Sequence, residues 1–176
     1  KAKLIAKNIV LQRSKKKILT HDLVSIIDRA KGYKKGKIHN ATKTFQALRI
    51  FVNKETTELI EGIIKATKLI KNGGKIIIIS FHSIEDKIVK FYFRNYSVNN
   101  LRPSRYLPEN KLEKLVLFKD KINNLIRPTE DEIKKNPPSR SAKLRFVTRN
   151  ENNFKDPKIL KEKFKRYLDL ESLNVK

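Results

Sequence analysis

Cysteine, methionine and tryptophan are all absent from this chain of 176 residues. Without cysteine there are no disulfide bonds, no thiolate nucleophile and no metal site built on thiolates. Its 3 histidines are far apart in the sequence, so we do not expect a metal site either. No apolar stretch approaches the roughly 20 residues of a membrane-spanning helix, and no secretory signal follows Lys1. We therefore expect a cytoplasmic protein without a membrane partner.

Acidic residues are also scarce, with 18 Asp and Glu against 42 Lys and Arg, which gives a formal net charge of +24. Such an excess predicts a polyanionic partner, and nucleic acid before a membrane surface. Residues 1–50 hold 14 of the basic side chains and only 2 acidic ones, so they are the best candidate for contact with phosphates. A merely solvated, lysine-rich surface is the alternative.

A helix–strand–helix pattern occupies the middle of the chain. Residues 55–70 have the apolar spacing of an amphipathic helix, which Asn72-Gly73-Gly74 ends. The isoleucine run at 75–80 predicts a strand buried on both faces, as in a parallel sheet. A loop at 81–83 leads to a helix from about residue 84 to residue 96. This order is typical of a doubly wound α/β sheet.

Too few strands accompany this unit for a complete sheet of that kind. Only residues 115–118 and 144–148 are further strand candidates, whereas a doubly wound sheet has about five strands or more. The other expected helices begin near residue 4, at Thr20 as N-cap, before Phe45, after Thr129 and at residue 157. The chain therefore has the pattern of the C-terminal part of a larger α/β protein.

Two polar clusters are candidate functional sites. The first follows the strand at 75–80, at the edge where open α/β sheets bind ligands. Its candidate site-lining residues are Ser80, His82, Ser83, Glu85 and Asp86. The alternative is that Ser83 caps the next helix and that the two acids complement its dipole.

The second cluster spans 136–145, where two prolines precede Ser, Arg, Ser and Lys. This pattern fits a phosphate clamp, and the alternative is an ordinary loop. The residues that we expect to contact the phosphates of a nucleic acid are Lys43, Arg49, Arg140 and Lys143. For Arg49, an ion pair with a carboxylate at the domain junction is a competing interpretation.

Three long blocks occur in these regions. They are His39-Asn40-Ala41-Thr42-Lys43-Thr44-Phe45-Gln46-Ala47-Leu48-Arg49-Ile50 with Val52-Asn53, then Gly73-Gly74 through Ser80-Phe81-His82-Ser83-Ile84-Glu85-Asp86-Lys87, and Asn136-Pro137 with Ser139-Arg140-Ser141-Ala142-Lys143-Leu144-Arg145. In sequence and order they resemble the bacterial 16S ribosomal RNA cytosine-N4 methyltransferases. Asn40, Lys43 and Ile84 stand where the family has Pro, Arg and Leu. From about Asn150 onward we recognise no counterpart.

The resemblance implies a Rossmann-like class I methyltransferase with an inserted helical domain, of which this chain is the C-terminal part. Residues 1–50 would be the end of the helical, RNA-recognising domain, 51–150 the C-terminal half of the methyltransferase domain, and 151–176 a helical tail. The co-substrate would be S-adenosylmethionine, held mainly by N-terminal motifs that are not in this sequence, and the substrate 16S rRNA of the small ribosomal subunit.

The resemblance also implies transfer of the methyl group to the exocyclic amine of a cytosine, with the first cluster lining the site and Glu85 or Asp86 as acceptors behind it. By itself the fragment is expected to be inactive. Two questions stay open from the sequence. The chain could instead be a non-catalytic RNA-binding module derived from the same fold, and the sequence does not decide whether it forms a homodimer.

Overall fold

The computed structural model describes residues 1–32, 39–98, 115–120 and 125–173. The chain divides into two compact units, Lys1–Glu55 and Thr56–Lys176. The division lies slightly later than the boundary after residue 50 that the sequence suggested. None of the helices in the described ranges is long and apolar enough to cross a membrane.

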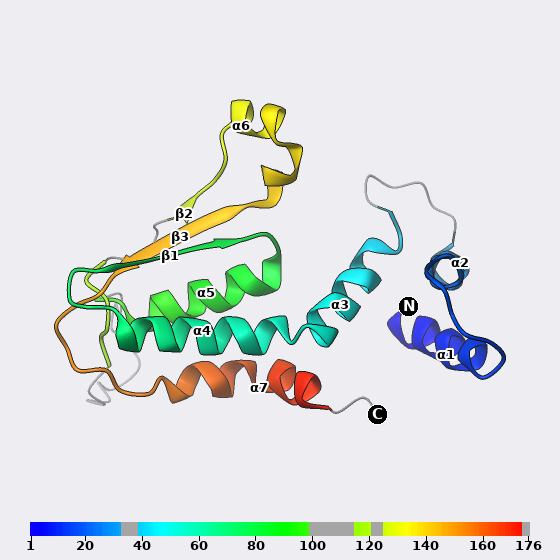
Figure 1. Ribbon diagram of the computed structural model, residues 1–176, viewed down its shortest axis with the longest axis horizontal. Coiled ribbons are helices and arrows are strands. Elements are labelled where there is room, and N and C mark those ends of the chain that lie inside the picture. The colour runs from blue at the N-terminus through cyan, green and yellow to red at the C-terminus, as the bar shows by residue number, and fades with distance from the viewer. Residues whose placement is uncertain (33–38, 99–114, 121–124, 174–176) are drawn as a thin grey trace, which may run out of the picture. The chain divides into compact units, whose positions relative to one another are not determined.

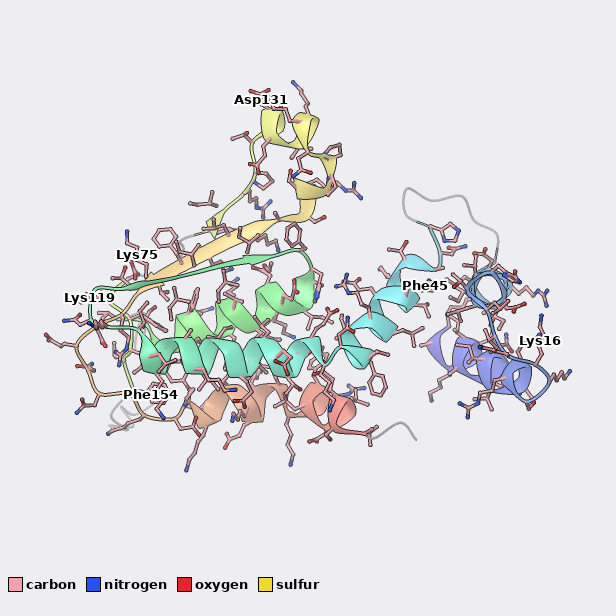
Figure 2. All side chains as sticks on the ribbon, viewed as in Figure 1. Lys16, Phe45, Lys75, Lys119, Asp131 and Phe154 are labelled. Carbon is pink, nitrogen blue, oxygen red and sulfur yellow. The ribbon has the colours of Figure 1, made fainter. Side chains whose placement is uncertain are left out.

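The first unit contains three helices, α1 (Ala2–Arg13), α2 (Thr20–Lys31) and α3 (Thr42–Val52). A small apolar cluster joins them, made of Ile5, Ile27, Ala30 and Ala41, and Phe45 packs against it (Figure 2). The expectation that Thr20 caps α2 is wrong, because Thr20 is the first residue of the helix. The backbone N–H of Leu19 instead donates to Asp22 Oδ2 at 3.0 Å, so a carboxylate of the first turn satisfies the helix start.

The second unit contains most of the regular structure. Its elements are α4 (Glu55–Leu69, whose first residue closes the first unit), β1 (Lys75–Ser80), α5 (Ser83–Tyr96), β2 (Leu125–Ile126), α6 (Glu130–Lys135), the short 3₁₀ helix η1 (Pro137–Ser141), β3 (Lys143–Thr148) and α7 (Lys158–Ser172). The predicted strand at 115–118 is wrong: only Phe118 forms bridges, to Ser97 and to Arg149. The α-helices and the strands β1 and β3 lie close to where the sequence pattern predicted them, whereas β2 and η1 were not predicted.

The turn between α4 and β1 depends on two glycines. Gly73 has a φ of 82°, a left-handed conformation that glycine adopts without steric cost. A Cβ atom on Gly74 would lie 2.5 Å from Cγ1 of Ile70, which is too close for any side chain. The Gly-Gly pair therefore ends the helix and lets the chain turn closely past it into the strand.

The three strands form an antiparallel sheet in the order β1-β3-β2. The parallel neighbours expected on both sides of β1, in the larger sheet that the sequence predicted, are not among the described residues. There β1 pairs only with β3, and Ile77 and Ile79 are 60% and 55% exposed while Ile76 is buried. The physical reason is visible in Figure 1, where α4, α5 and α7 all lie on the same side of the sheet.

The core between the sheet and the helices is rich in aromatic side chains. Tyr92 and Phe118 are fully buried, with their ring centroids 5.7 Å apart in an edge-to-face arrangement. The Tyr92 hydroxyl donates to Thr67 Oγ1 at 3.0 Å, and burial raises the pKa of Tyr92 to about 12. The hydroxyl therefore stays protonated and donates its hydrogen bond at neutral pH.

Helix α7, in the tail beyond residue 150, is part of this core. Leu160 and Phe164 are buried, and the Phe164 ring packs edge-to-face on Phe91 with centroids 5.6 Å apart. Lys161 Nζ also lies 2.8 Å from Glu61 Oε1 on α4. The tail is thus an integral layer of the second unit.

The last turn of α7 caps the first turn of α4. Glu171 is 4% exposed, and its carboxylate accepts hydrogen bonds from the Thr56 N–H at 3.1 Å, the Thr57 N–H at 2.8 Å and Thr57 Oγ1 at 2.7 Å. The first N–H groups of a helix have no partner within the helix, so an external acceptor stabilises its start. A negative charge there also complements the helix dipole.

We predict that Glu171→Ala lowers the free energy of unfolding by roughly 1–3 kcal/mol, because buried N–H groups of α4 lose their acceptor. Urea denaturation of the two proteins measures the difference. Glu162→Ala is the matched control, since Glu162 lies on the same helix and is exposed, and it should change stability by less than about 0.5 kcal/mol. Equal effects of the two substitutions would contradict the capping role.

Candidate functional site

The pairing of β1 with β3 brings the two polar clusters of the sequence to one end of the sheet. Ser80, the last residue of β1, lies opposite Lys143, the first residue of β3. The loop that follows Ser80 and the η1 segment that precedes Lys143 therefore both lie at this end of the sheet (Figure 1). We call this region the β1–β3 edge site.

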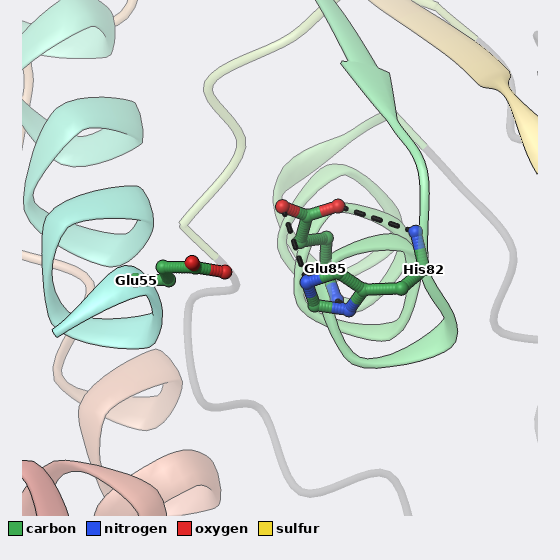
Figure 3. A group of neighbouring side chains, drawn as sticks. All are labelled: Glu55, His82 and Glu85. Atoms are coloured by element: carbon green, nitrogen blue, oxygen red, sulfur yellow. Dashed lines mark hydrogen bonds and ion pairs between the residues drawn. The ribbon is translucent and has the colours of Figure 1, made fainter. Parts of the chain in front are cut away.

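His82 and Glu85 cap the start of α5 together. The backbone N–H groups of Phe81 and His82 donate to Glu85 Oε2 at 2.9 and 3.3 Å, and the Glu85 N–H donates to His82 Nδ1 at 3.4 Å. His82 Nε2 lies 3.2 Å from Glu85 Oε1, as Figure 3 shows. The expectation that Ser83 caps this helix is wrong, because His82 occupies the N-cap and Ser83 is the first helical residue.

Asp86 is the centre of a buried ion-pair cluster beneath the sheet. Its Oδ1 lies 2.7 Å from Arg145 Nε, and its Oδ2 lies 2.9 Å from Lys143 Nζ. Burial raises the pKa of Asp86, but the hydrogen bonds from Arg145 and Lys143 outweigh it, so the pKa lies below its ordinary value. The carboxylate is therefore charged at neutral pH and fixes α5 to β3.

The two serines of the edge site have different environments. Ser80 is buried, and its Oγ donates to the Lys143 carbonyl at 3.4 Å, which ties the ends of the two strands together. Ser83 is exposed on the first turn of α5. Of the five predicted site-lining residues, four are thus held in contacts that shape the edge, and Ser83 presents its hydroxyl outward.

The four predicted RNA contacts divide in the same way. Lys43 on α3 and Arg140 on η1 are exposed. Arg49 makes a forked ion pair with Glu55, with Nε and Nη2 lying 2.7 and 3.0 Å from its two carboxylate oxygens. This is the contact named above as the competing interpretation of Arg49. Lys143 pairs with Asp86, as described above.

Arg145 and Phe81 lie in the two polar clusters that the sequence indicated, and the structure gives each of them a distinct environment. Arg145 is buried beside Asp86, and the signal for it was strand alternation, which places residue 145 on the same face as the core residue Val147. Phe81 is exposed directly after β1. The alternation of Ile77 and Ile79 on the open face continues to Phe81, so the same pattern could have indicated its exposure.

The described residues do not fit a methyl-donor site of the glycine-rich type. The described loops that lead from a strand to a helix span 81–82, 127–129 and 149–157, and none of them contains a glycine. Gly73-Gly74 lies before β1 instead of after it. No donor contact is therefore assigned to the residues of this chain.

Comparison with known proteins gives consistent results. The model of the MraW methylase family matches residues 1–150. A protein of Buchnera aphidicola named "Ribosomal RNA small subunit methyltransferase H" is 47% identical over 133 residues, which are 74% of this chain and 43% of that relative. A Coxiella burnetii protein of the same name is 43% identical over 153 residues, 83% of this chain and 47% of that relative. The chain spans less than half the length of these curated relatives.

We predict that Asp86→Ala lowers the free energy of unfolding by roughly 3–5 kcal/mol, because it leaves the buried Arg145 guanidinium without a counter-charge. Urea denaturation at pH 7 measures this loss. Asp131→Ala is the matched control: Asp131 is highly exposed and 3.7 Å from Lys134, so its removal should cost less than about 1 kcal/mol.

The same pair of variants predicts a pH dependence. The pKa of Asp86 is lower in the folded protein than its ordinary value of 3.8, so its contribution is fully present above about pH 4. It is lost as the pH falls through the folded-state pKa. The stability gap between wild type and Asp86→Ala should therefore narrow below pH 4. A gap that stays constant down to pH 2 would contradict the charged state of Asp86.

Proposed function

This chain belongs to the MraW methylase family, and on that basis we propose that it is the C-terminal part of a methyltransferase that modifies ribosomal RNA of the small subunit. The proposed reaction moves a methyl group from S-adenosylmethionine to the exocyclic amine of a cytidine. The observation that carries the proposal is the family match over residues 1–150, which includes the three blocks described above. The names of the Buchnera and Coxiella relatives support it.

The charge of the chain supports an RNA substrate. Its net charge of +24 attracts a polyanion over a long range, and the exposed side chains of Lys43 and Arg140 suit phosphate contacts. Arg49 and Lys143 are each paired with a carboxylate. In the proposal they therefore stabilise the protein structure and contribute less to phosphate contacts than Lys43 and Arg140 do. The working place of such a protein is the cytoplasm, where small subunits are assembled.

The edge site supports the chemistry on the base. The amine nitrogen of cytosine is a weak nucleophile because its lone pair is delocalised into the ring, so the protein helps by orienting it and by accepting its proton. Ser83 offers an exposed hydroxyl for this contact. His82 and Glu85 are positioning residues, since they hold the start of α5, and Asp86 and Ser80 hold the adjacent strand.

When bound, S-adenosylmethionine supplies an electrophilic methyl group, and the proposal assigns none of the described residues to its site. A second candidate is an RNA-binding module of this fold without catalytic activity, which the exposed cations Lys43 and Arg140 would serve equally well. The two candidates agree on the RNA and differ on methyl transfer.

A chimera tests the proposal. In the Coxiella burnetii relative, the 153 matched residues are replaced by those of this chain. We expect the chimera to methylate a cytidine of small subunits, detected by mass spectrometry of the digested rRNA. We expect the 176-residue chain alone neither to bind S-adenosylmethionine in calorimetry nor to methylate RNA. A chimera that binds the donor without methylating RNA would favour the non-catalytic module. Methylation of RNA by the 176-residue chain alone would contradict the proposal that the donor is bound by other parts of the protein.

RNA binding by this chain should depend steeply on salt, because phosphate contacts release counterions. Arg140→Ala should weaken binding of a single-stranded rRNA fragment and flatten the slope of log K against log[salt] by about 0.7–0.9. Arg94→Ala is the matched control, since Arg94 is exposed in the last turn of α5, at the end of that helix away from the edge site. It should leave the slope unchanged.

Within the chimera, His82→Ala makes the contrast with Arg140→Ala. It should lower the rate of methylation without changing the salt slope, because it disturbs the loop and removes no phosphate contact. An altered slope for His82→Ala, together with an unchanged slope for Arg140→Ala, would show that the two clusters have the opposite roles.

A further inference from the structure

A single aromatic ring is exposed in the part of the chain that the structure describes. Phe81 is 55% exposed, whereas the other phenylalanines and tyrosines of these residues are buried or half-buried. Exposing a phenyl ring to water is unfavourable, and contact with another flat or apolar group removes that cost. The position of the ring is therefore informative: it directly follows β1, at the edge site.

The backbone that carries this ring is fixed. The Phe81 N–H donates to Glu85 Oε2 at 2.9 Å, and the next residue, His82, is held by Glu85 through both its N–H and its imidazole (Figure 3). A ring on a fixed loop loses little conformational entropy when a ligand packs on it. The capping contacts thus make Phe81 a preorganised contact surface.

The surroundings of the ring favour an RNA base as its occupant. Ser80, which precedes Phe81, pairs with Lys143, and η1, which carries the exposed Arg140, ends two residues before Lys143. Ser83, two residues after Phe81, is also exposed. An apolar ring at the same end of the sheet as a cation and a serine matches the parts of a nucleotide, which has a flat base, a phosphate and polar base edges. The chain's charge of +24 disfavours a basic partner at this place.

We propose that Phe81 is the platform on which a base of single-stranded RNA stacks when it enters the edge site. This inference rests on the proposed function, in which that base is the cytosine to be methylated. The cytosine must leave its stack in the RNA before its amine is accessible, and the phenyl ring replaces part of the lost stacking. Phe81 then binds the ring of the base, while Ser83 and Arg140 face its polar parts.

The absence of tryptophan from the chain allows a direct test. Phe81→Trp introduces a single indole, which is titrated with hexacytidylate and with an abasic RNA of the same length. Hexacytidylate should quench its emission by stacking, and the abasic RNA should not. Ile159→Trp is the matched control, because Ile159 is 57% exposed on α7, and its indole should respond to neither RNA. Labelled RNA in the same samples reports binding by anisotropy.

Variants that keep or remove the ring complete the test. Phe81→Leu should weaken hexacytidylate binding by roughly 5- to 150-fold, the equivalent of about 1–3 kcal/mol for one stacked base, whereas Phe81→Tyr should bind as wild type does. Neither should change the salt slope, because the ring touches no phosphate. Three results would each overturn the inference. They are failure of hexacytidylate to bind, equal quenching by abasic RNA, and an RNA-independent blue shift of the emission as the protein concentration rises. The last result would show that the ring packs on a second copy of the chain.

The outcomes separate this inference from the proposed function. Base-dependent quenching at position 81 together with an inactive chimera would support stacking on Phe81 and contradict the proposed methyltransferase function. An active chimera without base-dependent quenching would support the methyltransferase function and contradict stacking on Phe81.

Discussion

The antiparallel pairing of β1 with β3 is the interaction on which the candidate site depends. Residues 80 and 143 are far apart in the sequence, and each lies in a polar cluster that has little meaning alone. Once the strands pair, the α5 start and the η1 segment lie at the same end of the sheet, and each carries exposed residues there. The carboxylate of Asp86 secures this arrangement from below, because it binds two cations of β3 from the first turn of α5.

Several arginines make their contacts within the protein. Arg145 is neutralised beneath the sheet, and Arg49 is paired with Glu55. Arg149 is buried and donates to the carbonyl oxygens of Thr67, Leu117 and Asn152, so it joins three segments of backbone. The net charge therefore indicates the class of partner, but only the exposed cations are available to bind that partner. Counting lysines and arginines along the sequence overstates the size of the RNA-binding surface.

The sequence predicted the local structure well and the long-range contacts poorly. The helix before Gly73, the strand at 75–80 and the cap at Thr129 follow from residue spacing, turn chemistry and a side-chain hydrogen bond, which are all local. The partner of β1 is not local, and an isoleucine run gives the same pattern whether one or both faces are covered. For the same reason, strand alternation can indicate that Arg145 is buried but not that Asp86 is its partner, and nothing near Glu171 in the sequence shows that it is buried against the start of α4.

The contact between Glu171 and the start of α4 can form only after α7 has been synthesised. A ribosome makes α4 long before α7, so the N–H groups of Thr56 and Thr57 have only water as partner until the last helix has emerged. Leu160 and Phe164 reach the core at the same late stage. Closure of the second unit therefore waits for the synthesis of α7 and has a large loop to close, and nascent chains stalled before residue 160 expose the apolar surface of α4 and α5 to chaperones.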